Sequence, residues 1–367
     1  MKIAITGSNG FIAKNLIYNL ILNKNFKVFK INRNTKKKEL NKILTNSEII
    51  FHFAGLNKET TNFKFQNDNI NLTKYICNFL KKKKLKKKII FSSSIQANLN
   101  NNYGKSKKKC EDILKNFTKK NNSSLIILRL PNIFGKWSKP NYNSAVSTFC
   151  YNISRGKKNT VINPNKIINL LYIDDLIFTL IKFLNKKKEK IKVVYKFKNI
   201  KKISVKKLLE LISKFESSRN SFYIKKFSSN FEKKLYSTYV HFIPLKKIKY
   251  DLISHKDKRG SFMEFVKTEN NGQFSIFKAK NNQIRGHHFH HSKVEKFLVI
   301  NGKAKFFMKD VSSNKKIEFL LDHREPQVVE TIPGWQHYIK NIGKEELSVL
   351  LWSNEVYNAN KPDTYRI

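Results

Sequence analysis

The chain's first turn has the sequence Thr6-Gly7-Ser8-Asn9-Gly10-Phe11-Ile12-Ala13. It lies after an apolar run, Ile3–Thr6, and opens a segment of helical periodicity, Phe11–Leu22. Gly7 permits a tight turn, and Gly10 lets the backbone approach a pyrophosphate, which the N–H groups and dipole of the following helix would attract. We therefore predict a dinucleotide site. Its first contacts are expected from Gly7, Asn9, Gly10, Phe11 and Ile12.

Apolar runs and helical patterns alternate through the first half of the chain, which indicates an α/β Rossmann-like, doubly wound parallel sheet. Residues 140–245 continue as mixed α/β with more helix, and we expect them to cover the open edge of the sheet and hold substrate. The expected strands are Ile3–Thr6, Phe26–Ile31, Ile49–Phe53, Lys88–Ser92 and Leu125–Leu130; the expected helices are Phe11–Leu22, Asn67–Lys82, Lys105–Asn121, Asp175–Asn185 and Ser204–Lys214.

The pattern changes after about residue 250. Short strand-like runs separated by turn signals predict an all-β domain, a small barrel or jelly roll. With 367 residues, two domains are expected, residues 1–248 and residues 249–367. The runs are Arg259–Phe262, Gly272–Ala279, Lys296–Ile300, Ala304–Met308 and Leu347–Trp352.

The net charge of +48 is almost entirely due to lysine, which accompanies heavy use of Asn and Ile. These residues share A- and T-rich codons, so we interpret the charge as compositional drift rather than a nucleic-acid surface. The runs Lys81–Lys84 and Lys86–Lys88 are accordingly expected to be solvated.

Neither a secretory leader nor a membrane span is expected. Met1 is followed at once by a strand pattern, and no apolar stretch of about eighteen residues occurs. The three cysteines form no CxxC pair, which argues against a disulfide scaffold or a Cys-zinc site. We expect a cytoplasmic protein with no membrane or nucleic-acid partner.

The end of the second predicted strand, Ile31-Asn32-Arg33-Asn34, bears on cofactor choice. An acidic residue there would bind a ribose 2′-hydroxyl and favour NAD, whereas this chain offers Arg33. A guanidinium at this position suits a 2′-phosphate, so we predict NADPH as the cofactor.

A second group of residues suggests proton transfer. Tyr103 and Lys107 are four residues apart, so a helix places both on one face, and Ser94 ends a predicted strand upstream. A lysine ammonium beside the phenol is expected to lower the tyrosine pKa, while the serine hydroxyl holds a substrate carbonyl.

The C-terminal part carries possible metal ligands. In a strand, His288 and His290 would point to the same side; a return strand can bring Glu295 beside them, and a distant strand can add His337. Three imidazoles and a carboxylate suit Zn, Fe, Mn or Ni. The neighbouring His287 and His291 are interpreted as solvated surface.

The first half resembles the extended short-chain dehydrogenase/reductase superfamily. The resemblance rests on Thr6–Ala13, Phe53–Gly55, Ser92–Ser94, Tyr103 with Lys107, Arg129–Gly135 and Tyr172–Asp175. It implies Ser94, Tyr103 and Lys107 as catalytic residues. It adds Phe53, Ala54, Gly55, Tyr103, Lys107 and Pro131 to the cofactor site and gives Ser94, Asn132, Asn141, Tyr142 and Asn143 as substrate contacts.

The second half resembles the cupins, through His288-x-His290, Glu295, Gly302, and then Pro333-Gly334, His337 and Asn341. End to end, the chain resembles a family of bifunctional capsular polysaccharide enzymes. The resemblance implies C3 epimerisation in a cupin that holds a divalent metal, expected to be Zn, and NADPH-dependent C4 reduction of UDP-2-acetamido-2,6-dideoxy-L-hexos-4-ulose toward UDP-N-acetyl-L-fucosamine. It also implies a UDP-amino-sugar substrate and a homodimer. Departures are Ala13, Lys58-Glu59 and His287.

Two other functions remain open. One is a sugar-nucleotide 4-epimerase or dehydratase with a non-catalytic cupin; a dehydratase needs acid–base groups beside its serine, and Ile95 and Gln96 argue against it. The other is a non-enzymatic basic binding protein, which salt-sensitive binding to duplex DNA would support.

Overall fold

The structure, a computed structural model, describes all residues except 59–68, 185–189, 222, 225–226, 252–253, 258–259, 264–266, 269–271, 356–359 and 367. The predicted positions Asn67, Asn185 and Arg259, and Glu59 among the departures, lie outside the described residues. The chain divides into two compact units. The first contains Met1–Ser144 and Ile168–Lys202, and the second Ala145–Ile167 and Ile203–Ile367.

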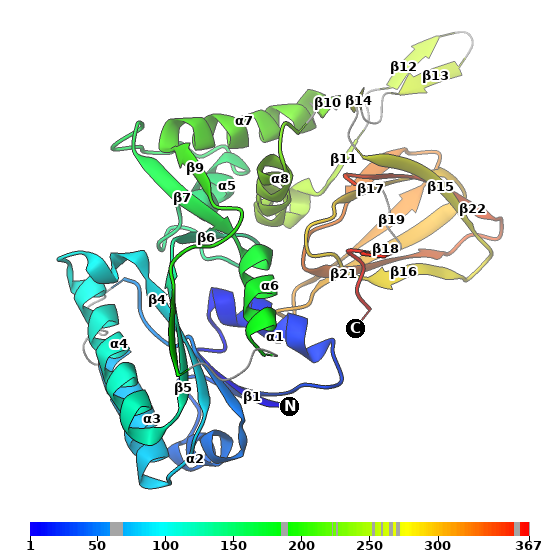
Figure 1. The fold of residues 1–367 in the computed structure, drawn as a ribbon. Helices are drawn as coiled ribbons and strands as arrows, with labels where there is room; N and C mark the ends of the chain where they lie inside the picture. Colours follow the sequence, from blue (N-terminus) through cyan, green and yellow to red (C-terminus); the bar gives the residue numbers. More distant parts are fainter. Residues whose placement is uncertain are drawn as a thin grey trace. The chain divides into compact units, whose positions relative to one another are not determined.

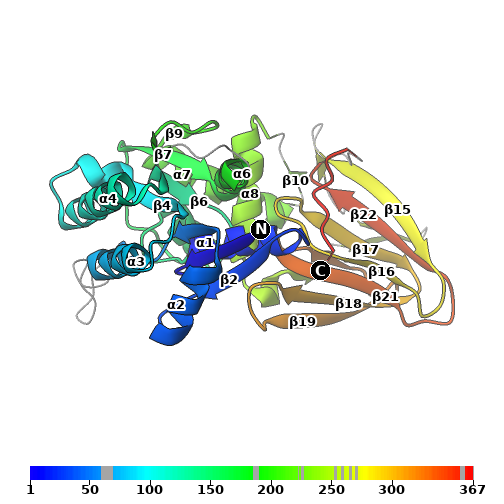
Figure 2. The same ribbon diagram turned by 60° about the horizontal axis from the view of Figure 1, so that its bottom comes forward.

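The first unit is built on a six-stranded sheet of order β2-β1-β3-β4-β5-β8, in which all strand pairs are parallel. Helices α2, α3 and α4 cover one face, and α1 and α6 the other (Figures 1 and 2). The predicted parallel, doubly wound sheet is therefore confirmed. The elements are β1 (Lys2–Thr6), α1 (Phe11–Ile21), β2 (Lys27–Ile31), α2 (Lys37–Asn46), β3 (Ile49–His52), α3 (Asn71–Lys82), β4 (Lys88–Ser94), η2 (Ile95–Asn98), α4 (Asn102–Asn121), β5 (Ser124–Leu130), α6 (Ile173–Leu184) and β8 (Ile191–Val194).

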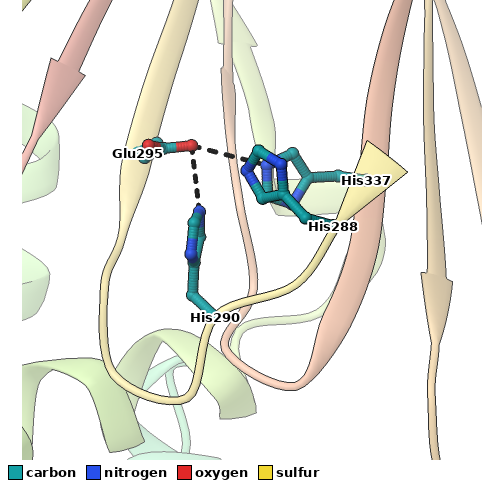
Figure 3. A group of neighbouring side chains, drawn as sticks. All are labelled: His288, His290, Glu295 and His337. Carbon is teal, nitrogen blue, oxygen red and sulfur yellow. Dashed lines mark ion pairs between the residues drawn. The ribbon is translucent and has the colours of Figure 1, made fainter. Parts of the chain in front are cut away.

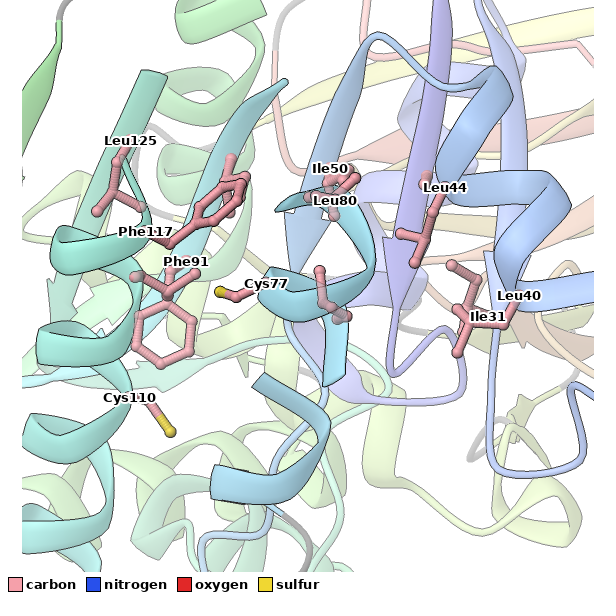
Figure 4. Packing of buried hydrophobic residues seen from close by; sticks show 14 of the residues in the cluster. Ile31, Leu40, Leu44, Ile50, Cys77, Leu80, Phe91, Cys110, Phe117 and Leu125 are labelled. Atoms are coloured by element: carbon pink, nitrogen blue, oxygen red, sulfur yellow. The ribbon is translucent and has the colours of Figure 1, made fainter. Parts of the chain in front are cut away.

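The core of this unit is formed around strands that are covered on both faces. All seven residues of β4 are buried, as expected for a parallel sheet covered on both faces. Phe91 of β4 and Leu125 of β5 pack with Phe117 of α4 and with the reduced thiols Cys77 and Cys110 (Figure 4). The predicted reduced cysteines are thus core residues.

One lysine prediction is wrong. Lys81–Lys84 are exposed, but Lys88 is the first residue of the buried strand β4 and is 5% exposed. Its Nζ donates to the Phe183 carbonyl, so the ammonium is satisfied inside the unit. A long aliphatic stem allows a lysine to occupy such a position when its charge meets a carbonyl.

Strand order positions the nucleotide site. β1 lies between β2 and β3. The chain adds β2 on one side of β1 and then crosses to add β3 on the other side, so the strand order reverses beside β1. Ligands of open α/β sheets bind at the carboxyl ends of the strands at such a point. The glycine turn follows β1 and the segment Phe53–Gly55 follows β3, which places both at this edge. A small separate sheet has the order β6-β7-β9, formed by β6 (Asn132–Phe134), β7 (Ile167–Tyr172) and β9 (Lys201–Ser204).

The second unit begins with three helices that pack against one another: α5 (Ala145–Ile153), α7 (Val205–Ser221) and α8 (Asn230–Phe242). Their contact is aromatic. The ring of Phe215 on α7 lies 5.3 Å from Tyr236 and 6.0 Å from Tyr239 on α8, measured between ring centroids. The short helix η3 (Leu245–Lys247) follows.

The rest of the second unit is all-β, as predicted. Two antiparallel sheets, of orders β11-β20-β17-β22-β15 and β16-β21-β18-β19, face each other. Phe297 of one and Phe306 of the other have ring centroids 4.9 Å apart. The strands are β10 (Tyr223–Ile224), β11 (Lys249–Asp251), β12 (Ser254–Asp257), β13 (Gly260–Met263), β14 (Lys267–Thr268), β15 (Gln273–Ala279), β16 (Ile284–His288), β17 (Glu295–Asn301), β18 (Lys303–Asp310), β19 (Lys316–Asp322), β20 (Gln327–Glu330), β21 (Trp335–Asn341) and β22 (Leu347–Ser353).

The strand ladders do not form a closed barrel among the described residues. The two larger sheets meet through side chains, and the pairs β10-β14 and β12-β13 stand apart from them. None of the helices in the described part of the chain is both long and apolar enough to cross a membrane.

Candidate functional sites

The glycine turn after β1 has no room for a larger first residue. Gly7 has φ +68°, and a Cβ placed on it would lie 2.7 Å from the Ala54 Cα atom. The Gly10 amide donates to the Gly7 carbonyl at 2.7 Å, and Ser8 donates to the carbonyl of Ile31 at 3.0 Å. The turn is therefore held against the ends of both neighbouring strands. A backbone cradle that excludes side chains fits a dinucleotide phosphate.

A buried histidine, which the sequence analysis did not identify, fixes this edge. His52 ends β3; its Nδ1 lies 2.8 Å from Thr6 Oγ1, and its Nε2 lies 2.9 Å from Thr73 Oγ1. Thr6 Oγ1 also accepts from the Ala54 amide at 3.0 Å. Burial, and then the charge of Lys107, lower the pKa of His52 to about 3. A neutral imidazole thus joins the end of β1 to α3, and Thr6 extends this connection to the segment after β3.

Asn69, which was also not predicted from the sequence, likewise links separate segments through its side chain. Its side chain accepts from the Leu56 amide at 2.6 Å and donates to the Leu56 carbonyl at 3.1 Å. It also donates to Ser106 Oγ of α4 at 3.3 Å. The predicted cofactor residues Phe53, Ala54 and Gly55 therefore lie in a segment connected to the helix that carries Tyr103.

Arg33, which is predicted to bind the 2′-phosphate, lies just after the end of β2. Arg33 is exposed and follows β2 by two residues. The backbone of this segment is ordered by Asn32, whose side-chain oxygen accepts from the Asn34 amide at 2.9 Å. The Ile31 carbonyl, two residues before Arg33, accepts a hydrogen bond from the Ser8 amide of the glycine turn. Arg33 therefore closely follows a direct contact between β2 and that turn.

Ser94, Tyr103 and Lys107 come together at the carboxyl end of β4. Ser94 ends the strand and Tyr103 lies in the first turn of α4. A Cβ on Gly104 would lie 2.1 Å from the Gln96 carbonyl oxygen, so only glycine lets α4 begin this close to η2. Tyr103 is hydrogen-bonded to Ser94. Lys107 Nζ donates to the Ser92 carbonyl at 2.8 Å and lies 5.9 Å from the centre of the Tyr103 ring.

The net shift of the Tyr103 pKa is opposite to the expected one. Burial raises the pKa of Tyr103 to about 12, against a lowering by the Ser94 hydrogen bond. The Lys107 ammonium is directed at the Ser92 carbonyl rather than at the phenol oxygen. Burial also lowers the pKa of Lys107 to about 8. Desolvation therefore determines the direction of the Tyr103 pKa shift.

An ion pair behind this site holds it in place. Glu111, one turn beyond Lys107, is fully buried and accepts from Arg129 Nε at 2.9 Å and Nη2 at 2.7 Å. Ser93 donates to the same carboxylate at 2.6 Å. Burial alone would raise the pKa of Glu111, but the bonds from Arg129 and Ser93 keep it below its usual value. The carboxylate thus anchors β4 beside Ser94. Sequence analysis noted Arg129 but missed Glu111.

The predicted substrate segment follows β5 and has an unusual backbone. Gly135 has φ +145°, and a Cβ there would lie 2.2 Å from Ile173 Cγ2. The buried Lys136 ammonium pairs with Asp174 at 2.9 Å, and the Lys136 carbonyl accepts from Asn15 of α1 at 3.3 Å. This segment is therefore fixed to the helix that opens at the glycine turn.

Of the predicted substrate residues, Tyr142 lies close enough to Tyr103 to contribute to the raised pKa of Tyr103, after burial. Asn143 donates to the Asn57 carbonyl at 3.2 Å, and Asn132 to that of Asn169 at 3.4 Å. Asn141 is exposed with φ +56°. Pro131, predicted to contact cofactor, separates β5 from β6.

The four predicted metal ligands meet between the two facing sheets (Figure 3). His288 ends β16 and is paired with His337 of β21, Glu295 begins β17, and His290 lies in the loop between. Their ligand atoms all lie within 4.8 Å of one another. Glu295 Oε2 is 3.2 Å from His290 Nε2 and 3.4 Å from His337 Nε2.

This donor set fits a metal ion chemically. The Nε2 atoms of His290 and His337 are buried, and neither makes a hydrogen bond within the described part of the chain. Burial, and then the neighbouring imidazoles, lower the pKa of His288 to about 3, and burial lowers that of His337. Neutral imidazoles and an ionised carboxylate are the ligand forms that Zn²⁺ takes.

Two local predictions here are wrong. His290 does not share a strand with His288, because β16 ends at His288 and His290 lies in the loop that leads to β17. His291 is not solvated: it is 6% exposed, and its ring centroid lies 5.2 Å from that of Phe289 and 4.7 Å from that of Tyr365. His287 is exposed, as predicted.

Helix α8 contacts the loop that contains His290 and the loop that precedes β21. Ser237 donates to the Ser292 carbonyl, and His241 Nδ1 lies 3.3 Å from the Pro333 carbonyl oxygen. Gly334 in turn donates to the His290 carbonyl at 2.8 Å. Asn341, a residue of the second cupin motif, has a structural role, because its buried side-chain amide donates to the carbonyls of Ala279 and Glu345.

Models of two protein families match separate parts of the chain. A model described as "NAD dependent epimerase/dehydratase family" matches residues 3–196, more than half of the chain. The chain belongs to this family. A second model, "Polysaccharide biosynthesis C-terminal domain", matches residues 255–365.

Relatives of this family member cover its whole length. The UDP-2-acetamido-2,6-beta-L-arabino-hexul-4-ose reductase of Pseudomonas aeruginosa is 38% identical over 100% of this chain and 98% of its own. The capsular polysaccharide assembling protein CapF of Staphylococcus aureus is 34% identical, with a TM-score of 0.66, covering 100% of this chain and 99% of that one. The UDP-glucuronic acid 4-epimerase of Bacillus cereus, 21% identical with a TM-score of 0.53, covers 60% of this chain and 84% of its own, and shares the fold. The chain is therefore a nucleotide-sugar-modifying enzyme of polysaccharide biosynthesis.

Proposed function

We propose that the chain is a bifunctional enzyme that epimerises C3 and reduces the C4 ketone of UDP-2-acetamido-2,6-dideoxy-L-hexos-4-ulose, as steps toward UDP-N-acetyl-L-fucosamine for capsular or O-antigen polysaccharide. The observation that carries the proposal is the meeting of Ser94, Tyr103 and Lys107 beside a dinucleotide turn. The proposed organisation is a homodimer in the cytoplasm, with residues 1–248 as the reductase and 249–367 as a metal-binding cupin.

In the reductase, NADPH supplies a hydride to C4 of the sugar when bound. The Ser94 hydroxyl holds the C4 carbonyl, and the Tyr103 hydroxyl gives its proton to the oxygen, so the ketone becomes an alcohol. A Tyr103 pKa of about 12 keeps the phenol protonated at neutral pH, which suits a proton donor and therefore the reductive direction. The positive charge of Lys107 beside the ring stabilises the negative charge that develops on the phenol oxygen.

In the C-terminal site, the chemistry is proton removal and return. A C4 ketone acidifies the neighbouring C3–H, so a base can take this proton and a proton can return on the opposite face. His288, His290, Glu295 and His337 would hold a divalent metal, proposed to be zinc, whose positive charge would stabilise the site or the reacting oxygen. Reduction at C4 then removes the ketone and makes the new configuration permanent.

Incubation with the UDP-4-keto-sugar and NADPH tests the proposal directly. We expect NADPH consumption equal to product formed, with NMR showing an inverted C3 and a new C4 hydroxyl. Reduction without inversion at C3 would contradict the proposed epimerase activity of the C-terminal domain. A product that keeps its ketone, or loses water, would instead support an epimerase or dehydratase with a non-catalytic C-terminal domain.

Cofactor preference should depend on Arg33. Arg33→Ala is expected to weaken NADPH binding about 10- to 100-fold more than NADH binding, because a charge-assisted bond to a phosphate contributes roughly 1.5–3 kcal/mol. Titration calorimetry with both cofactors measures this. Lys30→Ala, which removes an exposed cation three residues earlier on β2, is the matched control. Equal losses for both cofactors would show that Arg33 does not bind the 2′-phosphate.

The pH profile of reduction should reflect Lys107. Its pKa is lowered to about 8 by burial, so the ammonium is present below that pH and lost above it. We expect kcat for reduction to be constant near pH 7 and to fall as pH rises through about 8, before Tyr103 itself ionises. Lys107→Arg, which stays charged, should move this decline to higher pH. An unshifted decline in that variant would assign the titration to another group.

A further inference from the structure

The C-terminal tail reaches back to the loop that contains His290. The Asp363 carboxylate accepts from the amides of His291, Ser292 and Lys293 at 2.8, 2.7 and 2.8 Å, and from Ser292 Oγ at 2.8 Å. Three consecutive backbone N–H groups therefore end on one side chain. This loop lies outside any strand, so Asp363 supplies the hydrogen bonds that a sheet would otherwise provide.

The backbone of Asp363 acts on His290 itself. The Asp363 carbonyl oxygen is hydrogen-bonded to His290 Nδ1. A carbonyl only accepts, so Nδ1 must carry the proton, and the Nε2 lone pair is left facing Glu295 in the cluster. A carbonyl behind an imidazole fixes both the tautomer and the ring orientation of a metal ligand.

The residue after Asp363 bears on the carboxylate ligand. Thr364 Oγ1 accepts from Lys293 Nζ at 3.3 Å, and the same Nζ lies 3.2 Å from Glu295 Oε1. Glu295 Oε1 is thus occupied by an ammonium, while Oε2 faces His290 and His337. The tail is held in this position by a two-way backbone pairing between Tyr365 and Phe289, at 2.9 and 3.0 Å.

We propose that Asp363 is a positioning residue of the metal site, and that the C-terminal tail sets the geometry of His290 and Glu295 for metal binding. The inference rests on the proposed metal site. Asp363 lies 73 positions from His290 and 68 from Glu295 along the chain, so the tail closes the ligand loop from outside the two motifs that supply the ligands.

The test measures zinc affinity of the full-length protein by competition with a chromogenic chelator, with zinc alone as the probe. Asp363→Asn is expected to weaken zinc binding about 10- to 100-fold, because the loop amides lose their charged acceptor and the Asp363 carbonyl behind His290 is no longer held in place. Asp310→Asn is the matched control: its carboxylate also accepts from a backbone amide and two serine hydroxyls in the same all-β region. It should keep wild-type affinity.

Asp363→Glu separates geometry from charge. It keeps the negative charge but lengthens the side chain, so positioning predicts a loss of affinity similar to that of Asp363→Asn. Wild-type affinity in Asp363→Glu would reduce the residue's part to electrostatic attraction and overturn the proposal. Thermal melting with and without zinc shows whether each variant is folded, and the zinc-induced rise in Tm should shrink in both variants.

Ser292→Ala removes one bond to the same carboxylate and decides the matter if the Asp363 variants do not fold. A loss of about two- to five-fold in zinc affinity is expected from one weakened hydrogen bond. Unchanged affinity in Ser292→Ala or in a folded Asp363→Asn would overturn the proposal. If the wild-type protein binds no zinc, the metal site itself fails, which is a separate outcome.

Discussion

Tyr103→Phe is expected to lower kcat for NADPH-dependent reduction by about 10²- to 10⁴-fold, the usual cost of removing a positioned general acid. The phenol is partly buried and hydrogen-bonded to Ser94, and its pKa of about 12 makes it a proton donor throughout the neutral range. NADPH affinity should change little, because the glycine turn and its contacts with Ala54 and Ile31 are untouched. Stopped-flow NADPH oxidation and fluorescence titration measure the two quantities.

Tyr75→Phe is the matched control for this variant. Tyr75 is a partly buried tyrosine of α3 in the same unit, and its hydroxyl donates to Asn41 at 2.6 Å, away from Ser94. It should lose a similar hydrogen bond with no effect on the chemical step. Near-normal turnover by Tyr103→Phe, or an equal loss in both variants, would contradict the assignment of Tyr103 as the acid.

The sequence was sufficient wherever a feature is local. The turn at Gly7 and Gly10 and the spacing of Tyr103 and Lys107 depend on residues within one turn or one helix, and the structure places them as predicted. The parallel sheet followed from apolar runs alternating with helical periodicity, since a strand buried on both faces has no polar side.

The supporting residues could not be found in this way, because their partners are distant in the chain. His52 joins Thr6 and Thr73, and Glu111 joins Ser93 and Arg129. A single His or Glu in a helix or strand has no spacing that reveals such a pairing. The predicted direction of the Tyr103 pKa shift was wrong for a related reason: the largest cause is burial, which only the fold determines.

A buried group of charged side chains could not be predicted from the lysine composition either. Lys296 was predicted only as the start of a strand-like run, yet it is 2% exposed and pairs with the fully buried Glu330, which also pairs with Arg219 of α7. Composition explains how many lysines the chain has, whereas the fold determines which of them are enclosed. Inside the protein such a lysine requires a carboxylate or carbonyl partner.

His290→Ala is expected to weaken zinc binding by at least about 100-fold, because loss of a ligand should exceed the 10- to 100-fold cost of losing a partner behind one. In the proposed function, this variant also stops solvent deuterium from entering C3 of the keto-sugar. It should still oxidise NADPH with the unepimerised ketone, since Ser94, Tyr103 and Lys107 belong to the other unit. Metal analysis, NMR of C3 in deuterium oxide and NADPH absorbance measure the three results.

His323→Ala is the matched control, because His323 is a more exposed histidine in the same all-β region whose Nδ1 lies 3.1 Å from the Gly302 carbonyl oxygen. It should keep zinc, deuterium exchange and reduction. Metal binding can supply folding energy, so far-UV circular dichroism and thermal melting must show that His290→Ala is folded. Exchange at the wild-type rate in a folded, zinc-free variant would contradict a catalytic metal and assign the C3 proton to a non-metal base, for which His287 and His291 are the neighbouring candidates.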